Sequence, residues 1–192
     1  SSATTVMVVG FVNAGLMNLT NAVWVIMGAN IGTTITGQLI AIDITALAPI
    51  IAFIGIALIV FFKSKKTDAF GTIIGGLGIL FMGMEMMSNA MVPLRSSPEF
   101  VQIVSTFENP FIGILVGAVF TAIIQSSSAS VGILQALAKS GAVTLPSAIY
   151  VLFGQNIGTC ITAVLASVGT GRNAKRTTII HLSFNLIGTI IF

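Results

Sequence analysis

Long uncharged stretches dominate the hydrophobic pattern of this chain. Four of them contain no Asp, Glu, Lys or Arg: residues 1–42, 44–62, 109–138 and 140–171. Apolar runs of about 18 residues or more with few charges are typical of transmembrane helices. The pattern therefore predicts an all-α integral membrane protein. The segments that we expect to cross the membrane are 21–42, 44–62, 69–92 and 146–169.

The stretch at 109–138 is too long for one spanning helix and carries polar residues at its centre. As a straight helix it would extend about 45 Å, whereas a hydrocarbon core is about 30 Å thick. Its midpoint is Gln-Ser-Ser-Ser (125–128), and the apolar arms at 111–124 and 129–138 are each short. Irregular backbone at membrane depth must face protein or a cavity. The pattern therefore predicts a re-entrant helical hairpin with the serines at its tip.

The chain contains an internal repeat at an offset of 126 residues. Residues 1–43 align without a gap on residues 127–169, with 15 identities in 43 positions. Chance gives about two or three identities at a typical composition. The matches gather on polar and glycine positions, as where GANIGTTIT (28–36) meets GQNIGTCIT (154–162). We infer a duplication, with a first repeat at 1–66 and a second at 67–192.

The few positive charges predict how the two repeats are oriented. Six of the eight Lys and Arg residues lie in KSKK (63–66) and GRNAKR (171–176). Cytoplasmic loops are enriched in such residues, so we expect a multi-pass protein of the cell membrane with both loops in the cytoplasm. Counting crossings from these loops places the two serine tips on opposite sides, so the repeats are inverted. Inverted repeats with broken helices are the architecture of many secondary transporters.

The serine runs have the chemistry of an anion site. Ser127 or Ser128 can cap the helix that returns from the tip, because Ser is a favoured N-cap residue. The free N–H groups and the positive dipole end of that helix would then point into the site, and anions bind at such ends. Ser1, Ser2 and Thr4 offer the same groups from the other repeat. No Arg or Lys is nearby, so we expect bound cations to offset the charge of the anion.

The second repeated element is Gly-x-Asn-Ile-Gly-Thr, at 28–33 and 154–159. Two glycines and an Asn weaken a helix there, and an unwound segment would expose carbonyl oxygens. Six side chains add neutral oxygens that suit Na⁺: Asn30, Thr33, Thr36, Asn156, Thr159 and Thr162. Each copy is also a Gly-x-x-x-Gly, which can be a helix-packing face. We favour the ion site for these two copies, and packing for GTIIG (71–75) and GILVG (113–117).

Several function classes are excluded or disfavoured by what the sequence contains. Cys160 is the only cysteine, so neither an internal disulfide nor a multi-cysteine metal site is available. His181 is the only histidine, and no Gly-x-Ser-x-Gly elbow is present, so we do not expect an enzyme. We expect Na⁺ sites only, without a transition metal, an organic cofactor or a nucleic-acid partner. Glu85, inside a predicted span, is either a functional group or an interfacial one.

The doubled pattern resembles the type II sodium–phosphate cotransporter family. The resemblance rests on QSSSAS with GQNIGTCIT, on SSATT with GANIGTTIT, and on GGLGILFMGMEMMSNAM and HLSFNLIGTIIF. It covers essentially the whole chain. It implies sodium-coupled symport of inorganic phosphate across the lipid bilayer by alternating access, with the serine tips around the phosphate. The family's Gln before Ser1 and the preceding arm are absent here, so we expect a fragment in which both repeats are truncated.

The resemblance, taken with the residue chemistry, assigns the site residues. Those expected to bind phosphate are Ser1, Ser2, Ser127, Ser128, Asn30 and Asn156. Those expected to bind Na⁺ are Gln125, Ser126, Thr33, Thr36, Thr159 and Thr162. The residues alone indicate only a small oxyanion with cations, so sulfate or a carboxylate are alternative substrates. An ion channel, or a scaffold without transport, is the alternative in a different class.

Overall fold

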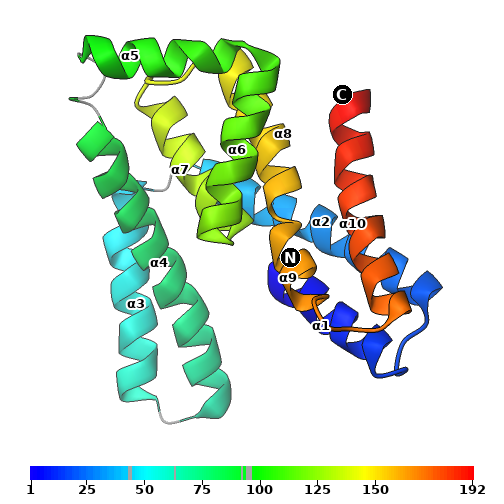
Figure 1. The fold of residues 1–192 in the computed structure, drawn as a ribbon. Helices are drawn as coiled ribbons and strands as arrows, with labels where there is room; N and C mark the ends of the chain where they lie inside the picture. Colours follow the sequence, from blue (N-terminus) through cyan, green and yellow to red (C-terminus); the bar gives the residue numbers. More distant parts are fainter. Residues whose placement is uncertain (43–44, 63, 92, 94–96) are drawn as a thin grey trace.

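The computed structural model describes residues 1–42, 45–62, 64–91, 93 and 97–192, and these are almost entirely helical (Figure 1). The α-helices are α1 (Ser2–Asn13), α2 (Leu19–Ala41), α3 (Ala48–Phe61), α4 (Lys65–Met91), α5 (Pro98–Ser105), α6 (Pro110–Ile124), α7 (Ser127–Lys139), α8 (Leu145–Gly158), α9 (Ile161–Ala166) and α10 (Arg172–Ile191). Two short 3₁₀ helices are η1 (Thr45–Leu47) and η3 (Thr106–Glu108).

Three described helical segments are long and apolar enough to cross a membrane. They are Leu19–Ala41, Lys65–Met87 and Leu145–Ala166. A fourth is added if Gln102–Glu108 and α6, which meet at a bend of 111°, count as one span. The spans predicted at 21–42, 69–92 and 146–169 are therefore confirmed in length and composition. Many large apolar side chains on these helices are exposed, as lipid-facing residues would be.

The span predicted at 44–62 is shorter than expected. Asp43, Ile44 and Lys63 at its borders lie outside the described residues. The helix itself, α3, has 14 residues and is about 21 Å long, less than a hydrocarbon core of about 30 Å. Pro49 in its first turn accounts for the late start, because Pro is tolerated at a helix N-terminus and disfavoured in the interior.

The hairpin predicted at the centre of 109–138 has the expected arms. Helices α6 and α7 are separated only by Gln125 and Ser126, and Gln125 adopts a left-handed conformation with φ 59°. The arms were predicted at 111–124 and 129–138; the helices extend the first by one residue and the second by three. The re-entry of this hairpin into a membrane stays a prediction.

The turns that follow α1 and α7 are the same structure at equivalent repeat positions. Gly15 and Gly141, 126 residues apart, have φ of 72° and 73°. The next helix is capped in each case by a side chain, with Asn18 accepting from Asn21 N and Thr144 accepting from Ser147 N. Glycine adopts this left-handed backbone without steric cost. The repeat seen in the sequence is therefore also a repeat of local structure.

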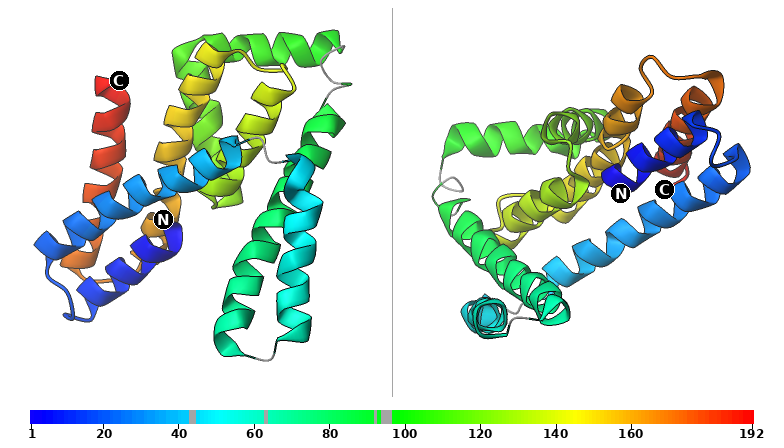
Figure 2. Two further views of the ribbon diagram at one scale, coloured as in Figure 1. Left: turned by 180° about the vertical axis from the view of Figure 1, so that it is seen from behind. Right: turned by 90° about the horizontal axis from the view of Figure 1, so that it is seen from below.

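Small residues hold the helices together in two pairs. In α3 and α4, a Cβ added at Gly55 would meet the backbone of Gly75, and one at Gly78 would meet Ala52. This pair lies at one edge of the molecule, and α1 and α10 lie at the opposite edge (Figure 2). Packing without side chains brings backbones into close contact, which is the usual way in which membrane helices associate. The packing predicted for GTIIG (71–75) is confirmed.

Helices α6 and α8 form the second pair. A Cβ at Gly113 would meet Tyr150, one at Gly117 would meet Val151 O, and one at Gly158 would meet Ala118 O. Because the partners advance together along both helices, α6 and α8 run parallel, with α7 returning beside them. The packing predicted for GILVG (113–117) is confirmed.

Candidate functional site

The two serine runs meet at the N-termini of α1 and α7. The Oγ atoms of Ser1 and Ser127 are 3.4 Å apart, although the residues are separated by 126 positions in the sequence. From this point α1 and α7 lead away in different directions (Figure 1). Ser127 is buried, with 8% of its surface exposed. The structure thus brings together the two segments that the sequence analysis singled out first.

Helix α2 closes the third side of a small polar cavity at this meeting point. The cavity has a volume of about 270 Å³, and we call it the serine cavity. Its lining residues are Ser1, Thr4, Ala29, Gly32, Thr33, Thr36, Ser127 and Ser128. Five of the twelve predicted site residues are among them. Every polar side chain in this lining is a hydroxyl, so the lining is neutral.

Helix geometry gives this neutral cavity a positive potential. The first turn of an α-helix leaves backbone N–H groups without intrahelical partners, and the helix dipole places partial positive charge there. Here two such ends, those of α1 and α7, adjoin one cavity. Hydroxyl groups add hydrogen-bond donors of adjustable direction. The arrangement suits a small oxyanion.

The cap of α7 differs in detail from the prediction. Ser126, rather than Ser127 or Ser128, is the N-cap, and its Oγ accepts a hydrogen bond from Ala129 N at 3.3 Å. The Ser126 Oγ also lies 3.4 Å from the Ser128 Oγ. Gln125 has φ > 0 and ends α6, so the serine after it is the first residue available as a cap. This shift leaves Ser127 in the first turn, facing Ser1.

The unwinding predicted at the two Asn-Ile-Gly-Thr copies is wrong for the first copy. Helix α2 continues without a break from Leu19 to Ala41 through residues 28–33. In the second copy α8 ends at Gly158, but Thr159 and Cys160 keep right-handed helical angles. The threonines bond their own helices instead, Thr33 to Ala29 O and Thr159 to Gln155 O. Such bonds let a hydroxyl remain in an intact helix.

The two copies also differ in how their glycines are used. Gly154 and Gly158 contact α6, since an added Cβ would meet its backbone. At the equivalent Gly28 and Gly32, an added Cβ would meet nothing within 4 Å. The packing interpretation that we ranked second is therefore correct for the glycines of the second copy. The role of the Asn and Thr side chains as ligands stays a prediction.

Seven predicted residues lie outside the lining of the serine cavity: Ser2, Asn30, Gln125, Ser126, Asn156, Thr159 and Thr162. Asn156 is exposed and Thr159 is buried. The Nδ2 atom of Asn30 is buried and has no hydrogen-bond partner within the described part of the chain. Polar atoms buried in this way are uncommon in folded proteins and require an explanation.

Three further residues with buried polar atoms were missed by the sequence analysis. The Gln155 Nε2 donates to Ser130 O at 3.0 Å, and the Gln155 Oε1 is buried without a partner among the described residues. The same holds for the hydroxyls of Thr121 and Ser130. These are neutral oxygens on α6, α7 and α8, the kind of ligand that suits Na⁺. Gln155 could have been noticed as a polar residue within an apolar segment. It was missed because its repeat equivalent is Ala29, and the sequence analysis relied on residues that both repeats share.

The last helix contributes a polar cluster of a different kind. Asn185 Nδ2 donates to Cys160 Sγ at 3.2 Å and to His181 O at 3.1 Å. His181 is fully buried, and neither ring nitrogen has a hydrogen-bond partner in the described part of the chain. The contact between Asn185 and Cys160 joins α10 to the start of α9. The face of α10 that carries His181 and Asn185 therefore has a structural role.

Comparison with known proteins assigns the chain to a family. The model of the Na⁺/Pi-cotransporter family matches residues 1–89 and 95–192. YqeW of Bacillus subtilis is 35% identical over the whole chain, which spans 62% of that protein. The Escherichia coli protein named "Putative inorganic phosphate export protein YjbB" is 29% identical over the whole chain, which spans 35% of it. This chain therefore covers less than two thirds of the length of either relative.

A human relative carries a name that also states the ion. Human sodium-dependent phosphate transport protein 2B is 30% identical over 132 residues, which are 63% of this chain and 19% of that protein. No solved structure matches the chain. The family match covers both serine runs and both Asn-Ile-Gly-Thr copies. The two serine runs and the first of these copies line the serine cavity. On these grounds the chain belongs to the Na⁺/Pi-cotransporter family.

Proposed function

We propose that this chain forms the substrate site of a sodium-coupled symporter of inorganic phosphate that works by alternating access. The observation that carries the proposal is the contact between Ser1 and Ser127, which joins the serine runs of both repeats in one polar cavity. A site built from two halves of a repeat can be exposed to either side by moving one half against the other. The family match supports phosphate as the solute.

Phosphate would lie in the serine cavity. The hydroxyls of Ser1, Ser127 and Ser128 and the first-turn N–H groups of α1 and α7 would donate to its oxygens. Ser2, Asn30 and Asn156 complete the proposed phosphate set. Since no cationic side chain lines this cavity, the charge of phosphate has to be offset by other means. Bound Na⁺ supplies that charge and at the same time couples the two ions.

The Na⁺ ligands that we propose are neutral oxygens on α2, at the α6–α7 tip, at the end of α8 and on α9. They are Gln125, Ser126, Thr33, Thr36, Thr159 and Thr162. The contacts of Gly158 with Ala118 and Thr121 bring the end of α8 beside the end of α6, which supports the grouping of Gln125 with Thr159. The unpartnered oxygens of Thr121, Ser130 and Gln155 would be satisfied by the same kind of ion.

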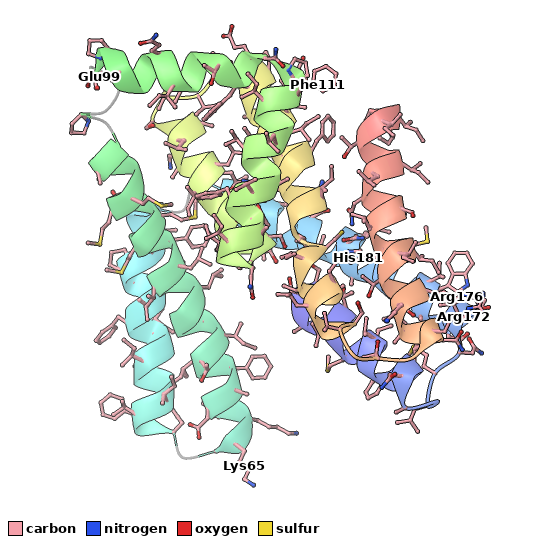
Figure 3. All side chains as sticks on the ribbon, viewed as in Figure 1. Lys65, Glu99, Phe111, Arg172, Arg176 and His181 are labelled. Carbon is pink, nitrogen blue, oxygen red and sulfur yellow. The ribbon has the colours of Figure 1, made fainter. Side chains whose placement is uncertain are left out.

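The inverted arrangement of the repeats and the cytoplasmic location of KSKK and GRNAKR belong to the same proposal. Gly171 N donates to Asn13 Oδ1 at 2.8 Å, which joins the end of α1 to the start of α10. The predicted topology places both of these ends in the cytoplasm. Lys65, Arg172 and Arg176 also lie toward one end of the molecule, whereas Glu99 and Phe111 lie toward the other (Figure 3). The positive-inside rule supports the cell-membrane orientation stated above.

The test is uptake of radiolabelled phosphate into proteoliposomes that contain the full-length protein. We expect accumulation when Na⁺ is high outside, and none when K⁺ replaces Na⁺. Unlabelled phosphate should compete, and sulfate or a carboxylate should not. Competition by sulfate or a carboxylate instead would change the substrate and leave the architecture. Uptake that follows the phosphate gradient alone, without accumulation, would be the behaviour of a channel. Inserted, folded protein without flux of any anion would indicate a scaffold.

Export is a second candidate direction, because YjbB is named for phosphate export and is 29% identical over the whole chain. The same proteoliposomes distinguish the two. Vesicles are loaded with labelled phosphate, and its loss is followed with Na⁺ inside, outside or absent. Loss that does not depend on Na⁺ would favour an exporter without sodium coupling.

A further inference from the structure

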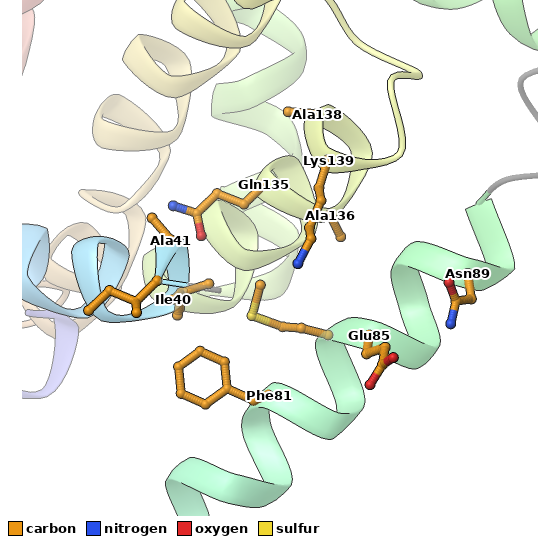
Figure 4. A pocket seen from close by; sticks show the side chains of 11 residues that line it. Ile40, Ala41, Phe81, Glu85, Asn89, Gln135, Ala136, Ala138 and Lys139 are labelled. Carbon is orange, nitrogen blue, oxygen red and sulfur yellow. The ribbon is translucent and has the colours of Figure 1, made fainter. Parts of the chain in front are cut away.

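A larger cavity lies at the far end of α7 from the serines. We call it the mouth cavity; its volume is about 470 Å³. It is lined by the C-terminal ends of α2 and α7 and by the second half of α4. Four of its lining side chains are polar or charged: Glu85, Asn89, Gln135 and Lys139. Gln135 and Lys139 come from α7, and Glu85 and Asn89 come from the facing α4 (Figure 4).

A third cavity lies between the mouth cavity and the serine cavity. This middle cavity, of about 390 Å³, lies between α2, α4 and α7. It shares Ile40 and Met84 with the mouth cavity. It shares Thr36 and Ser128 with the serine cavity. Because neighbouring cavities have walls in common, the three form one series along α7, from Lys139 at its last turn to Ser127 at its first.

The chemistry of the lining changes along this series. Glu85, Asn89 and Lys139 are exposed at the mouth, whereas Gln135 is half-buried. The Gln135 Nε2 donates to Gly37 O at 3.0 Å, which fixes the amide against α2. The middle cavity is mostly apolar, with Leu80, Met84, Met87 and Ile133 in its wall. An apolar section therefore separates the two polar ones.

We propose that phosphate and Na⁺ reach the serine cavity along α7, through the mouth cavity and the middle cavity. This inference rests on the proposed function, which supplies the solutes, and adds the path and the residues at its entrance. Lys139 attracts the anion at the mouth, and Glu85 attracts the cation. Charged groups at the entrance of a low-dielectric cleft raise the local concentration of ions of opposite sign.

Cysteine accessibility tests the path without reference to transport. Gly132 and Gly83 line the middle cavity and have room for a side chain, since the nearest atom to an added Cβ at Gly132 is Ile40 Cδ1 at 4.0 Å, and at Gly83 nothing lies within 4 Å. Gly188→Cys is the matched control, because Gly188 has equal room on α10 and lines none of the three cavities. Cys160, which is 1% exposed, gives a low background in the parent protein.

The reagent is a negatively charged, membrane-impermeant methanethiosulfonate. It is added to the side of the membrane that is nearer to Lys139, at the C-terminal end of α7. We expect Gly83→Cys and Gly132→Cys to react about ten-fold faster than Gly188→Cys. Water in the proposed path would admit the reagent and let the thiol ionise, whereas lipid around α10 disfavours the reactive thiolate. Reaction at Gly132→Cys should also block phosphate uptake. Labelling of these two positions by a lipid-soluble maleimide alone would show that lipid fills the middle cavity, and would overturn the proposal.

The mouth residues are tested by the kinetics of uptake in the full-length protein. Lys139→Gln should raise the KM for phosphate about three- to ten-fold with little change in kcat, and high salt should reduce the difference. Glu85→Gln should raise the apparent KM for Na⁺ instead. If Gly83→Cys and Gly132→Cys do not react with the thiol reagent in protein that takes up phosphate normally, the path is rejected and the proposed function is kept. Labelled cysteines in protein that moves no phosphate would keep the path and reject the function.

Discussion

Ser127 contributes to two features at once, the first turn of α7 and the wall of the serine cavity. Its backbone belongs to the helix, and its Oγ lies 3.4 Å from the Ser1 Oγ of the other repeat. Since the side chain takes no part in capping α7, which Ser126 does, its removal should leave the helix intact. This separation of roles makes Ser127 the best position for testing the phosphate site.

We expect Ser127→Ala to fold normally and to bind phosphate more weakly. A hydrogen bond to a charged group contributes about 1.5–3 kcal/mol, so the KM for phosphate should rise about 10- to 100-fold. The measurement is initial uptake against phosphate concentration in proteoliposomes. Ser167→Ala is the control, because the Ser167 Oγ donates to Val164 O at the end of α9. Equal KM values for the two variants would remove Ser127 from the phosphate site.

Gln155 allows a test of the sodium ligands that does not depend on transport. We expect Na⁺ to raise the melting temperature of the parent protein in detergent, because an ion that binds only the folded state stabilises it. In Gln155→Met this rise should be much smaller, since the buried Oε1 is removed at similar side-chain volume. Loss of the bond to Ser130 O should itself lower stability by only about 1 kcal/mol.

The matched control for this measurement is Gln135→Met. Gln135 also donates from Nε2 to a backbone carbonyl and also has a buried Oε1 without a partner among the described residues, but it lines the mouth cavity. Gln135→Met should therefore keep the full rise in melting temperature with Na⁺. K⁺ should not raise the melting temperature of either variant. A full Na⁺ response in Gln155→Met would exclude Gln155 as a ligand.

At this scale the sequence predicted which residues are repeated, but not which are buried. Ser1 and Ser127 could be paired in advance because they recur at the same offset in both repeats. Gln155 could not, because its repeat equivalent is Ala29 and identity between the repeats was the signal used. The buried hydroxyls of Thr121 and Ser130 depend on the packing of α6 and α7, which a linear pattern does not contain.

At the scale of the elements, the glycine contacts between α6 and α8 determine how closely the α6–α7 hairpin packs against the span that contains α8 and α9. We expect Gly154→Ala to lower the melting temperature by several degrees, because a Cβ there would meet the α6 backbone and overpacking costs about 1–3 kcal/mol. Thermal unfolding in detergent is the measurement. Gly188→Ala, with open space around it, should be neutral or should stabilise α10 by about 0.5–1 kcal/mol.

An unchanged melting temperature in Gly154→Ala would mean that α6 and α8 are not in close contact in the protein. If the two variants behave alike, the glycines of the second Gly-x-x-x-Gly are not a packing face. The alternative that we first favoured, a site made by an unwound backbone, would then regain support. The two interpretations thus differ in an observable that needs no substrate.

Helix positions were well predicted from the sequence, whereas helix continuity was not. Long apolar runs with few charges correctly located α2, α4 and the span that contains α8 and α9, because burial in lipid imposes a minimum length. The break predicted at residues 28–33 failed because Gly and Asn weaken a helix by only about 1 kcal/mol each, and the surrounding helix can absorb this. Thr33 adds a bond to Ala29 O within the same helix.

For the molecule as a whole, the predicted orientation in the membrane can be tested by cysteine labelling. We expect Ser64→Cys and Asn173→Cys, both at exposed positions within the basic segments KSKK and GRNAKR, to react with an impermeant thiol reagent only from the cytoplasmic side. Glu99→Cys, on α5, should react only from the other side. Labelling in intact cells and in inverted vesicles makes the comparison. Reaction of all three cysteines from one side would rule out the inverted arrangement.

Composition, repeat and charge were enough to predict a multi-pass helical protein with two related halves. They were not enough to predict the shape of the site, because the serine cavity needs the contact between α1, α2 and α7, which are distant in the sequence. The short α3 was also not foreseen. Hydropathy measures the length of an apolar run, and it does not show where Pro49 lets the helix begin.

Helix α7 is one uninterrupted rod of 13 residues, about 20 Å long, with the serines at one end and Lys139 at the other. Tilting a rod about its middle moves its two ends in opposite directions. A tilt that moves the Lys139 end in one direction therefore moves the Ser127 end in the opposite direction. The mouth cavity and the serine cavity would then change shape together, with Gly132 close to the axis of the tilt.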